Sequence, residues 1–404
     1  MPSSSATLPG RRESHGPTRF PARSAVDRGT RFLVLLLLPL LCCRPAPPPP
    51  VRIGVITYQP SDLNGPSTSN AIQLAAEEAN AAGGLLIGGV RRQVEIRSLV
   101  INEGSPEQAV AGVQKLINQE KVCAIIGPQN SDEAIPAAGL ANRSGIPLVS
   151  PISSHVMTTK DRPFVFRTCF RDDVQGKAMA RFAREALKAK TAALLVEVSH
   201  TYSRMIAEVF RREFIALGGR IVADTAFTDP KEDLGRQLQE IKRSGADVLV
   251  LPNYNEASRV AGIAARRLGI RSRFLGSDAW SRSHLRSVPE FDGSFMVTNW
   301  SPGLETEVNA RFLAAYARRF PIEPSETAAL TYDAAKLLFA AIATTGDGSP
   351  VSIQQALYGL RDFVGTSGRI RYTTNGDPEK AVVVLQFKAG KDHVAQVLAA
   401  GTGP

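Results

Sequence analysis

Three serines that follow short apolar runs are the residues of this chain best suited to hold a small anion. Ser131 comes shortly after the apolar run 122–126. Ser153 and Ser154 come shortly after a second run, 146–150. Such runs are typical of parallel strands buried on both faces, and residues 131–143 fit the crossover helix between them. Hydroxyls and helix N-termini at the ends of such strands hold small anions. The pattern predicts a binding pocket and offers no nucleophile.

Other kinds of chemistry find no support in the residue pattern. The five histidines are scattered, with no i, i+4 pair and no cysteine partner, so we expect no metal site. Two glycine pairs, at 83–84 and 88–89, lack the G-x-x-x-x-G-K-[ST] order that holds a phosphate. No Ser-His-Asp set and no pair of catalytic carboxylates can be argued from the sequence, so we expect neither an enzyme nor a cofactor. His155 and His200 lie near the predicted pocket and are open to contact with a ligand.

The positive charge of the chain does not indicate nucleic-acid binding. The net charge is +10 over 404 residues, but residues 1–50 carry seven Arg against two acids, which is half of it. The other half is spread over the rest of the chain without blocks of like charge. A nucleic-acid partner needs a concentrated basic patch, so we expect none.

The N-terminus has the pattern of an export signal. Arg28 and Arg31 precede ten apolar residues, 32–41, which are too few to span a bilayer and suit the core of a signal peptide. We therefore expect residues 1–43 to be a signal peptide and residues 44–50, which are rich in proline, to be a tether.

The cysteines that follow this apolar core resemble the acylation site of a bacterial lipoprotein. Cys43 fits that pattern better than Cys42, because a small residue normally precedes the acylated cysteine. The resemblance implies a protein that is exported to the periplasm or the cell surface and tethered there by lipid. The other two cysteines, Cys123 and Cys169, are expected to be unpaired core thiols, although a disulfide stays open in an exported protein.

Strand and helix patterns alternate in two successive blocks. In the first, strands are predicted at 51–57, 94–100, 122–126 and 146–150, with amphipathic helices between them. In the second, strands are predicted at 192–197, 221–227, 247–251 and 274–277. A long helical segment, 305–344, and a strand, 382–387, follow. The alternation predicts an α/β protein with two lobes, each built on a parallel sheet.

Seven motifs in their order resemble type I periplasmic solute-binding proteins of the leucine/isoleucine/valine-binding kind, the receptor components of ABC importers. These motifs are AAEEANAAGG (75–84), IIGPQNSDEAIPAA (125–138), GIPLVSPISS (145–154), VFRTCFRDDVQG (165–176), FLAAYARRF (312–320), AALTYDAAKLL (328–338) and GTSGRIRY (365–372). The resemblance implies two Rossmann-like lobes joined by three chain crossings. Lobe 1 would comprise 51–171 and 299–380, and lobe 2 would comprise 172–298 and 381–404.

The resemblance also implies a set of ligand contacts. A ligand carboxylate would be held by Ser131 and by the loop residues Ile152, Ser153 and Ser154. A ligand ammonium would be held by Asp278, while Tyr202 closes over the ligand and Tyr254 is a second cleft aromatic. Tyr58 and Trp280 are possible lining residues of the cleft.

Several of these residues could instead have a purely structural role. Ser131 is also suited to cap the following helix, and Asp278 to pair with a surface arginine such as Arg282. Tyr58, Tyr254 and Trp280 are equally suited to ordinary core packing.

The function implied is that of an extracytoplasmic receptor that captures an amino acid, branched-chain or similar, or a related small polar ligand, by closure of two lobes. Its partners would be that ligand and a membrane permease, and the receptor itself is expected to be a monomer. A ligand sensor of the same fold that feeds a signalling or regulatory partner is the alternative, because fold alone does not decide function.

Overall fold

The structure is a computed structural model that describes residues 47–62, 65–372 and 375–399. The residues from Pro48 onward form one compact unit, which is the subject of this description. The predicted signal peptide, both candidate acylation cysteines and most of the predicted tether lie outside the described residues. Among the described residues, no helix is both long and apolar enough to cross a bilayer.

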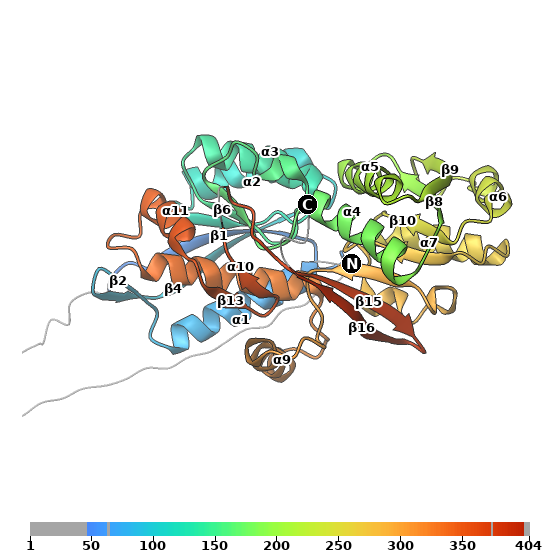
Figure 1. Ribbon diagram of the computed structural model, residues 1–404. Coiled ribbons are helices and arrows are strands. Elements are labelled where there is room, and N and C mark those ends of the chain that lie inside the picture. The colour runs from blue at the N-terminus through green and yellow to red at the C-terminus, as the bar shows by residue number, and fades with distance from the viewer. Residues whose placement is uncertain (1–46, 63–64, 373–374, 400–404) are drawn as a thin grey trace, which may run out of the picture. The chain divides into compact units, whose positions relative to one another are not determined.

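The first sheet has five parallel strands in the order β4-β1-β5-β6-β7. Their bounds are β1 (Val51–Tyr58), β4 (Val94–Ile101), β5 (Ala124–Ile126), β6 (Leu148–Ser150) and β7 (Val165–Arg167). Helices α2 (Pro106–Asn118) and α3 (Ser131–Arg143) cover one face, and α1 (Gly65–Ala81) and α10 (Glu326–Ala343) cover the other (Figure 1). We call this sheet with its helices lobe 1.

Residue types along β1 explain why both faces of this sheet are covered. Ile53 and Val55 lie in the core under α1 and α10, whereas Ile56 lies in the core under α2 and α3. Because side chains alternate between the faces of a strand, an apolar residue at nearly every position requires helices on both sides.

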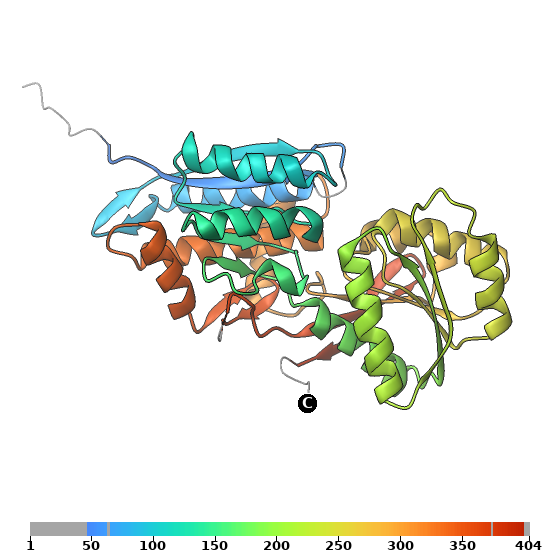
Figure 2. The same ribbon diagram turned by 90° about the horizontal axis from the view of Figure 1, so that it is seen from above.

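The second sheet has seven strands in the order β16-β15-β12-β11-β10-β8-β9. Five of them are parallel: β8 (Thr191–Glu197), β9 (Arg220–Phe227), β10 (Val248–Leu251), β11 (Arg273–Gly276) and β12 (Phe295–Thr298). The antiparallel hairpin β15 (Val382–Lys388) and β16 (Lys391–Leu398) extends it beyond β12. Helices α4 (Asp172–Arg181) and α5 (Thr201–Ala216) lie on one face, and α6 (Gly235–Ser244) and α7 (Asn255–Arg267) on the other (Figure 2). We call this sheet with its helices lobe 2.

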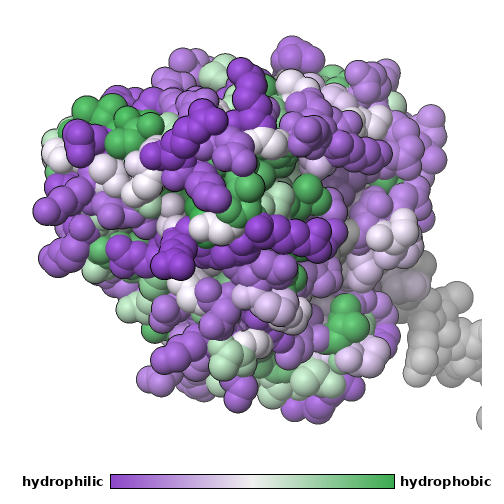
Figure 3. Space-filling model, turned by 90° about the vertical axis from the view of Figure 1, so that its right-hand side faces the viewer, coloured by the Kyte–Doolittle hydropathy of each residue, from purple (hydrophilic) through white to green (hydrophobic). Residues whose placement is uncertain are grey.

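Short elements complete the described chain. They are the hairpins β2 (Leu85–Ile87) with β3 (Val90–Arg92) and β13 (Phe363–Gly365) with β14 (Gly368–Ile370), the helices α8 (Arg282–Leu285), α9 (Glu307–Arg319) and α11 (Pro350–Gly359), and the single turns at Val156–Thr158, Phe182–Ala186 and Pro289–Phe291. The face shown in Figure 3 is mostly hydrophilic, with apolar side chains in small groups. Such a surface is typical of the outer sides of amphipathic helices.

The predicted fold class, an α/β protein with two lobes on parallel sheets, is confirmed. The chain passes between the two sheets three times: between β7 and α4, between β12 and α9, and between β14 and β15. The expected single helical segment 305–344 is wrong, because it breaks into α9 and α10 around a loop that holds Pro321 and Pro324. Cys123 and Cys169 are both free thiols, and burial raises the pKa of Cys123 to about 12.

Candidate functional site

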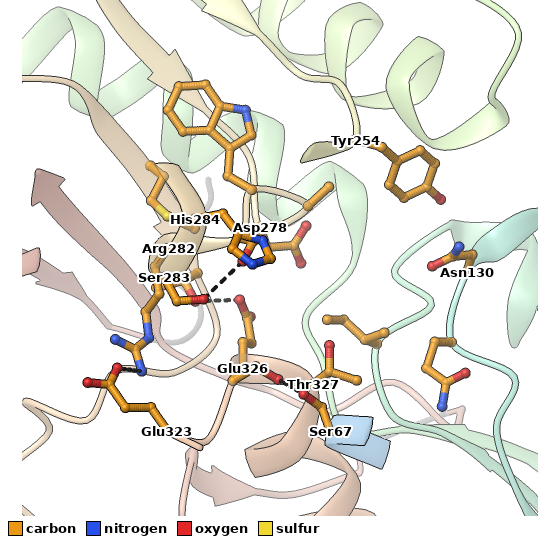
Figure 4. A pocket seen from close by; sticks show the side chains of 18 of the residues that line it. Ser67, Asn130, Tyr254, Asp278, Arg282, Ser283, His284, Glu323, Glu326 and Thr327 are labelled. Carbon is orange, nitrogen blue, oxygen red and sulfur yellow. Dashed lines mark hydrogen bonds and ion pairs between the residues drawn. The ribbon is translucent and has the colours of Figure 1, made fainter. Parts of the chain in front are cut away.

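A cavity of about 440 Å³ lies at the carboxyl ends of strands from both sheets (Figure 4). A volume of this size is in the range of small-molecule sites. Both lobes contribute to its wall. The lining residues are Pro66, Ser67, Gln129, Asn130, Ser131, Ile152, Tyr202, Tyr254, Asp278–Arg282, Ser283, His284, Arg286, Met296, Thr298, Ile322, Glu323 and Ser325–Thr327.

The N-terminus of α3 forms the lobe 1 wall of the cavity. Asn130 is the N-cap residue, and Ser131, the first helical residue, is buried with its hydroxyl accepting from Ser153 Oγ at 3.2 Å. Ser131 is therefore not the cap, and the first-turn N–H groups next to it favour an anion. Tyr58 is buried behind this wall, where its hydroxyl accepts from the Asn130 N–H at 3.0 Å. Tyr58 thus supports the turn and does not line the cavity.

The loop after β6 contributes Ile152 to the lining, while its two serines lie behind the cavity. The Ser153 hydroxyl bonds Ser131 and, at 2.7 Å, Thr158. The Ser154 carbonyl accepts from the N–H of Asp172 at 2.9 Å, and its hydroxyl lowers the pKa of that carboxyl. Burial dominates and still raises the Asp172 pKa to about 8. The side chains of Ser153 and Ser154 therefore support the wall from behind.

Arg167, at the end of β7, holds this loop in place and was not anticipated from the sequence. Its side chain is fully buried, ion-paired to Asp377 at 2.8 Å, and donates to the carbonyls of Ser153 at 2.7 Å and His155 at 2.9 Å. Because the peptide unit is planar and trans, a Ser153 carbonyl turned toward Arg167 aims the N–H of Ser154 the opposite way. The available sequence signal was a charged residue that ends a buried apolar strand.

The lobe 2 wall is centred on Asp278, which follows β11 and is only 6% exposed. Its carboxyl accepts from Tyr202 Oη at 2.5 Å, Gln175 Nε2 at 3.0 Å and Asn299 Nδ2 at 3.1 Å. Burial raises its pKa to about 6, although these donors act in the opposite direction. Arg282 pairs instead with Asp392 at 3.2 Å, so the surface-pair alternative for Asp278 does not hold.

Two stacked tyrosines continue this wall. The rings of Tyr202 and Tyr254 lie 5.3 Å apart at 23°, and both residues line the cavity. Trp280 also lines it, but its indole N–H donates into lobe 2, to the Leu251 carbonyl at 3.1 Å and to Ser258 Oγ at 2.8 Å. Trp280 therefore belongs to the core of lobe 2 as well as to the cavity wall.

Comparison with known proteins agrees with this geometry. The family model described as periplasmic binding protein matches residues 50–392. The chain belongs to this family.

Several relatives of this periplasmic binding protein are named as amino-acid-binding proteins. This chain is 25% identical to the Leu/Ile/Val-binding protein BraC3 of Rhizobium johnstonii, over 89% of this chain and 98% of BraC3. The leucine-binding protein LivK of Thermotoga maritima is 29% identical, with a TM-score of 0.79 over 86% of this chain and 99% of LivK. LivJ of Streptococcus pneumoniae, solved in complex with isoleucine, is 27% identical, with a TM-score of 0.79 over 87% and 99% of the two chains. The resemblance inferred from the sequence motifs is confirmed.

A second carboxyl, which we did not predict from the sequence, lies in the wall of the cavity. Glu326 opens α10 after the N-cap residue Ser325 and accepts from Thr298 Oγ1 at 2.6 Å. It also accepts from the N–H and the Nδ2 of Asn299, at 2.6 and 2.8 Å. Burial and the nearby Asp278 raise the Glu326 pKa to about 8. The sequence did contain a signal for this helix start, because a serine stands between two prolines and an apolar run. The prediction of one long helix overlooked it.

The lobes also touch each other at the rim of the cleft. On one side, Asp132 of α3 contacts His200 Nδ1 at 3.0 Å and accepts from Thr201 Oγ1 at 2.6 Å. On the other side, Glu323 is ion-paired to Arg286 at 2.9 Å. The hydrogen bond with Asp132 raises the His200 pKa and lowers that of Asp132. Side chains of the two lobes therefore contact each other at two places around the cavity.

Proposed function

We propose that this periplasmic binding protein captures an amino acid in the cleft and delivers it to the permease of an ABC importer. The observation that carries the proposal is the opposed chemistry of the two walls. The N-terminus of α3 with Ser131 suits a carboxylate, and Asp278 across the same cavity suits an ammonium. The amino-acid-binding names of the relatives support the same ligand class.

The two-lobed architecture suggests an order of events. The ligand carboxylate docks on lobe 1, at Ser131, Ile152 and the N–H groups of the 152–154 loop. Lobe 2 then closes by hinge motion at the three crossings and brings Asp278 and Tyr202 onto the ammonium. A ligand stabilises the closed form only through contacts that the open form lacks, and these are the contacts of lobe 2.

Delivery to a permease calls for a receptor that stays at the membrane. We propose that residues 1–43 act as a signal peptide, that Cys43 or Cys42 carries the lipid, and that 44–50 is the tether.

We also propose that lobe 1 comprises 51–171 and 299–380, that lobe 2 comprises 172–298 and 381–404, and that the receptor acts as a monomer.

A thermal-shift screen tests the ligand class. Amino acids, amides and short carboxylic acids would be added singly to the mature protein, and only compounds with both an α-ammonium and a carboxylate are expected to raise the melting temperature. Saturation at 100 times the dissociation constant stabilises a protein by about 2.7 kcal/mol, which is a readily measured shift. A shift with simple carboxylic acids and none with amino acids would refute the proposal.

A further inference from the structure

The first turn of α10 makes one part of the cavity wall polar. Ser325, Glu326 and Thr327 all line the cavity there, and the Ser325 hydroxyl donates to Ser67 Oγ of lobe 1 at 2.8 Å. A branched aliphatic side chain placed against the Glu326 carboxyl would give this buried polar group no hydrogen bond, which is unfavourable. This end of the cavity suits a ligand group that makes hydrogen bonds.

Glu326 and Asp278 both lie on the wall of the cavity (Figure 4). The side-chain nitrogen of Asn299 donates to Asp278 Oδ2 at 3.1 Å and to Glu326 Oε1 at 2.8 Å, so one side chain links the two carboxyls. A carboxylate has about four acceptor positions. Protein donors fill three on Asp278, namely Tyr202, Gln175 and Asn299.

The Glu326 carboxyl also has three protein donors. They are Thr298 Oγ1 and the two nitrogens of Asn299. Each of the two carboxyls thus keeps one acceptor position, and both residues line the cavity.

The charges of the lining residues leave these two carboxyls without a cation. Arg286 is ion-paired to Asp392 at 2.6 Å and to Glu323 at 2.9 Å, and Arg282 pairs with Asp392 at 3.2 Å. Within the part of the chain that the structure describes, neither Asp278 nor Glu326 has an arginine, lysine or histidine at ion-pair distance. The buried Lys380 interacts electrostatically with Glu326, but Asp333 is its stronger acidic neighbour and its amino group bonds Ser367.

Taking the proposed amino-acid function as given, we propose that Glu326 is a second cation-binding carboxyl and that the ligand is a basic α-amino acid. The α-ammonium meets Asp278, and the cationic end of the side chain meets Glu326. The two cationic groups of such a ligand balance the two carboxyls, while its carboxylate is held at the N-terminus of α3.

The protonation of the empty site is consistent with this assignment. Burial raises the pKa of Asp278 to about 6, and burial together with Asp278 raises that of Glu326 to about 8. The buried Asp172 and the Tyr202 hydroxyl also interact with Asp278, and Lys380 interacts electrostatically with Glu326, though less than with Asp333. Burial and the neighbouring Asp278 thus disfavour the charged form of Glu326, and a ligand cation beside it would favour that form.

Calorimetric titration of the mature protein tests the assignment with lysine, ornithine and arginine against leucine and isoleucine. At least one basic amino acid is expected to bind tenfold or more tightly than either aliphatic one. Glu326→Gln keeps the shape and most hydrogen bonds but removes the charge. It is expected to weaken the basic ligand 10- to 100-fold, the range for a lost charge-assisted hydrogen bond, and to change leucine binding less than threefold.

The control is Glu307→Gln, which changes an exposed glutamate in the first turn of α9 that does not line the cavity. It is expected to leave both ligand classes within threefold. Tighter binding of leucine or isoleucine than of every basic amino acid overturns the inference while the proposed function stands. Equal weakening of both classes in Glu326→Gln also overturns it, because it would show that Glu326 acts only through the fold. Absence of binding for every amino acid removes the proposed function as well.

Discussion

At the scale of single residues, Asp278 is the group on which ammonium recognition depends. It is almost completely buried, and its protein partners are the neutral donors Tyr202, Gln175 and Asn299. A buried carboxylate held only by neutral donors has no compensating charge until a cation arrives, which is why burial raises its pKa.

Asp278→Asn is therefore expected to weaken binding of an α-amino acid by about 2–5 kcal/mol, because it removes one partner of a buried charge pair. Calorimetric titration measures this loss. Asp161→Asn, an exposed lobe 1 position where the residue has a positive φ of 57° that asparagine tolerates, is the matched control and should bind normally. Unchanged affinity in Asp278→Asn would mean that no ammonium lies there.

At the scale of elements, two helix N-termini from different lobes meet at Asp132. This carboxylate lies in the first turn of α3 and, across the cleft, bonds the Thr201 hydroxyl that opens α5. An acid near a helix N-terminus is favourable, so Asp132 stabilises both helices at once, but the contribution to α5 exists only in the closed form.

Loss of a helix cap costs about 1 kcal/mol, so Asp132→Ala is expected to weaken ligand binding about fivefold.

His200 makes this contact dependent on pH. Its pKa is raised in the closed form, mainly by the hydrogen bond with Asp132, and Glu197 and Glu133 face the same ring. A raised pKa means that the stabilisation is complete below the ordinary histidine value of about 6.5 and is lost as the pH rises through the raised value. Asp132, whose pKa is lowered, keeps its charge throughout this range.

The expected result is an affinity ratio between the wild type and His200→Asn that is largest near pH 6 and shrinks toward pH 8. Titration of one amino acid at several pH values measures it, and effects of Asp278 and Glu326 cancel because both proteins contain them. A ratio that does not change with pH would exclude a charged His200 as part of the contact.

At the scale of the whole molecule, closure depends on three chain crossings and two small rim contacts. The rim contacts are partly exposed ion pairs, at Asp132 and at Glu323, and such pairs contribute little each. The closed form is thus held by weak protein contacts, to which the ligand adds its contacts with lobe 2.

Small-angle scattering tests this balance. A double variant, Asp132→Ala with Glu323→Ala, is expected to have a larger radius of gyration than the wild type when free. Saturating ligand should bring both proteins to the same smaller value, because ligand contacts then dominate. A wild-type radius that is identical with and without ligand would argue against hinge closure.

The sequence by itself determined the fold and one set of cleft residues. Periodic apolar runs fix strands and helices locally, and two βα blocks in succession leave little choice but two α/β lobes. The matched motifs predicted a set of cleft residues that the structure places around one cavity, namely Ser131, Ile152, Tyr202, Tyr254 and Asp278. Each of them lies shortly after a strand, and the ends of parallel strands converge at one edge of the sheet.

Only the tertiary structure decided what surrounds these residues. Gln175 and Asn299 lie next to two of the chain crossings and both contact Asp278, whereas Glu326 opens α10 and is joined to Asp278 through Asn299. Arg167 likewise acts on a loop that precedes it by more than ten residues. A sequence pattern reports local periodicity, whereas burial, shared hydrogen bonds and the resulting pKa of a carboxyl depend on which distant segments fold against it.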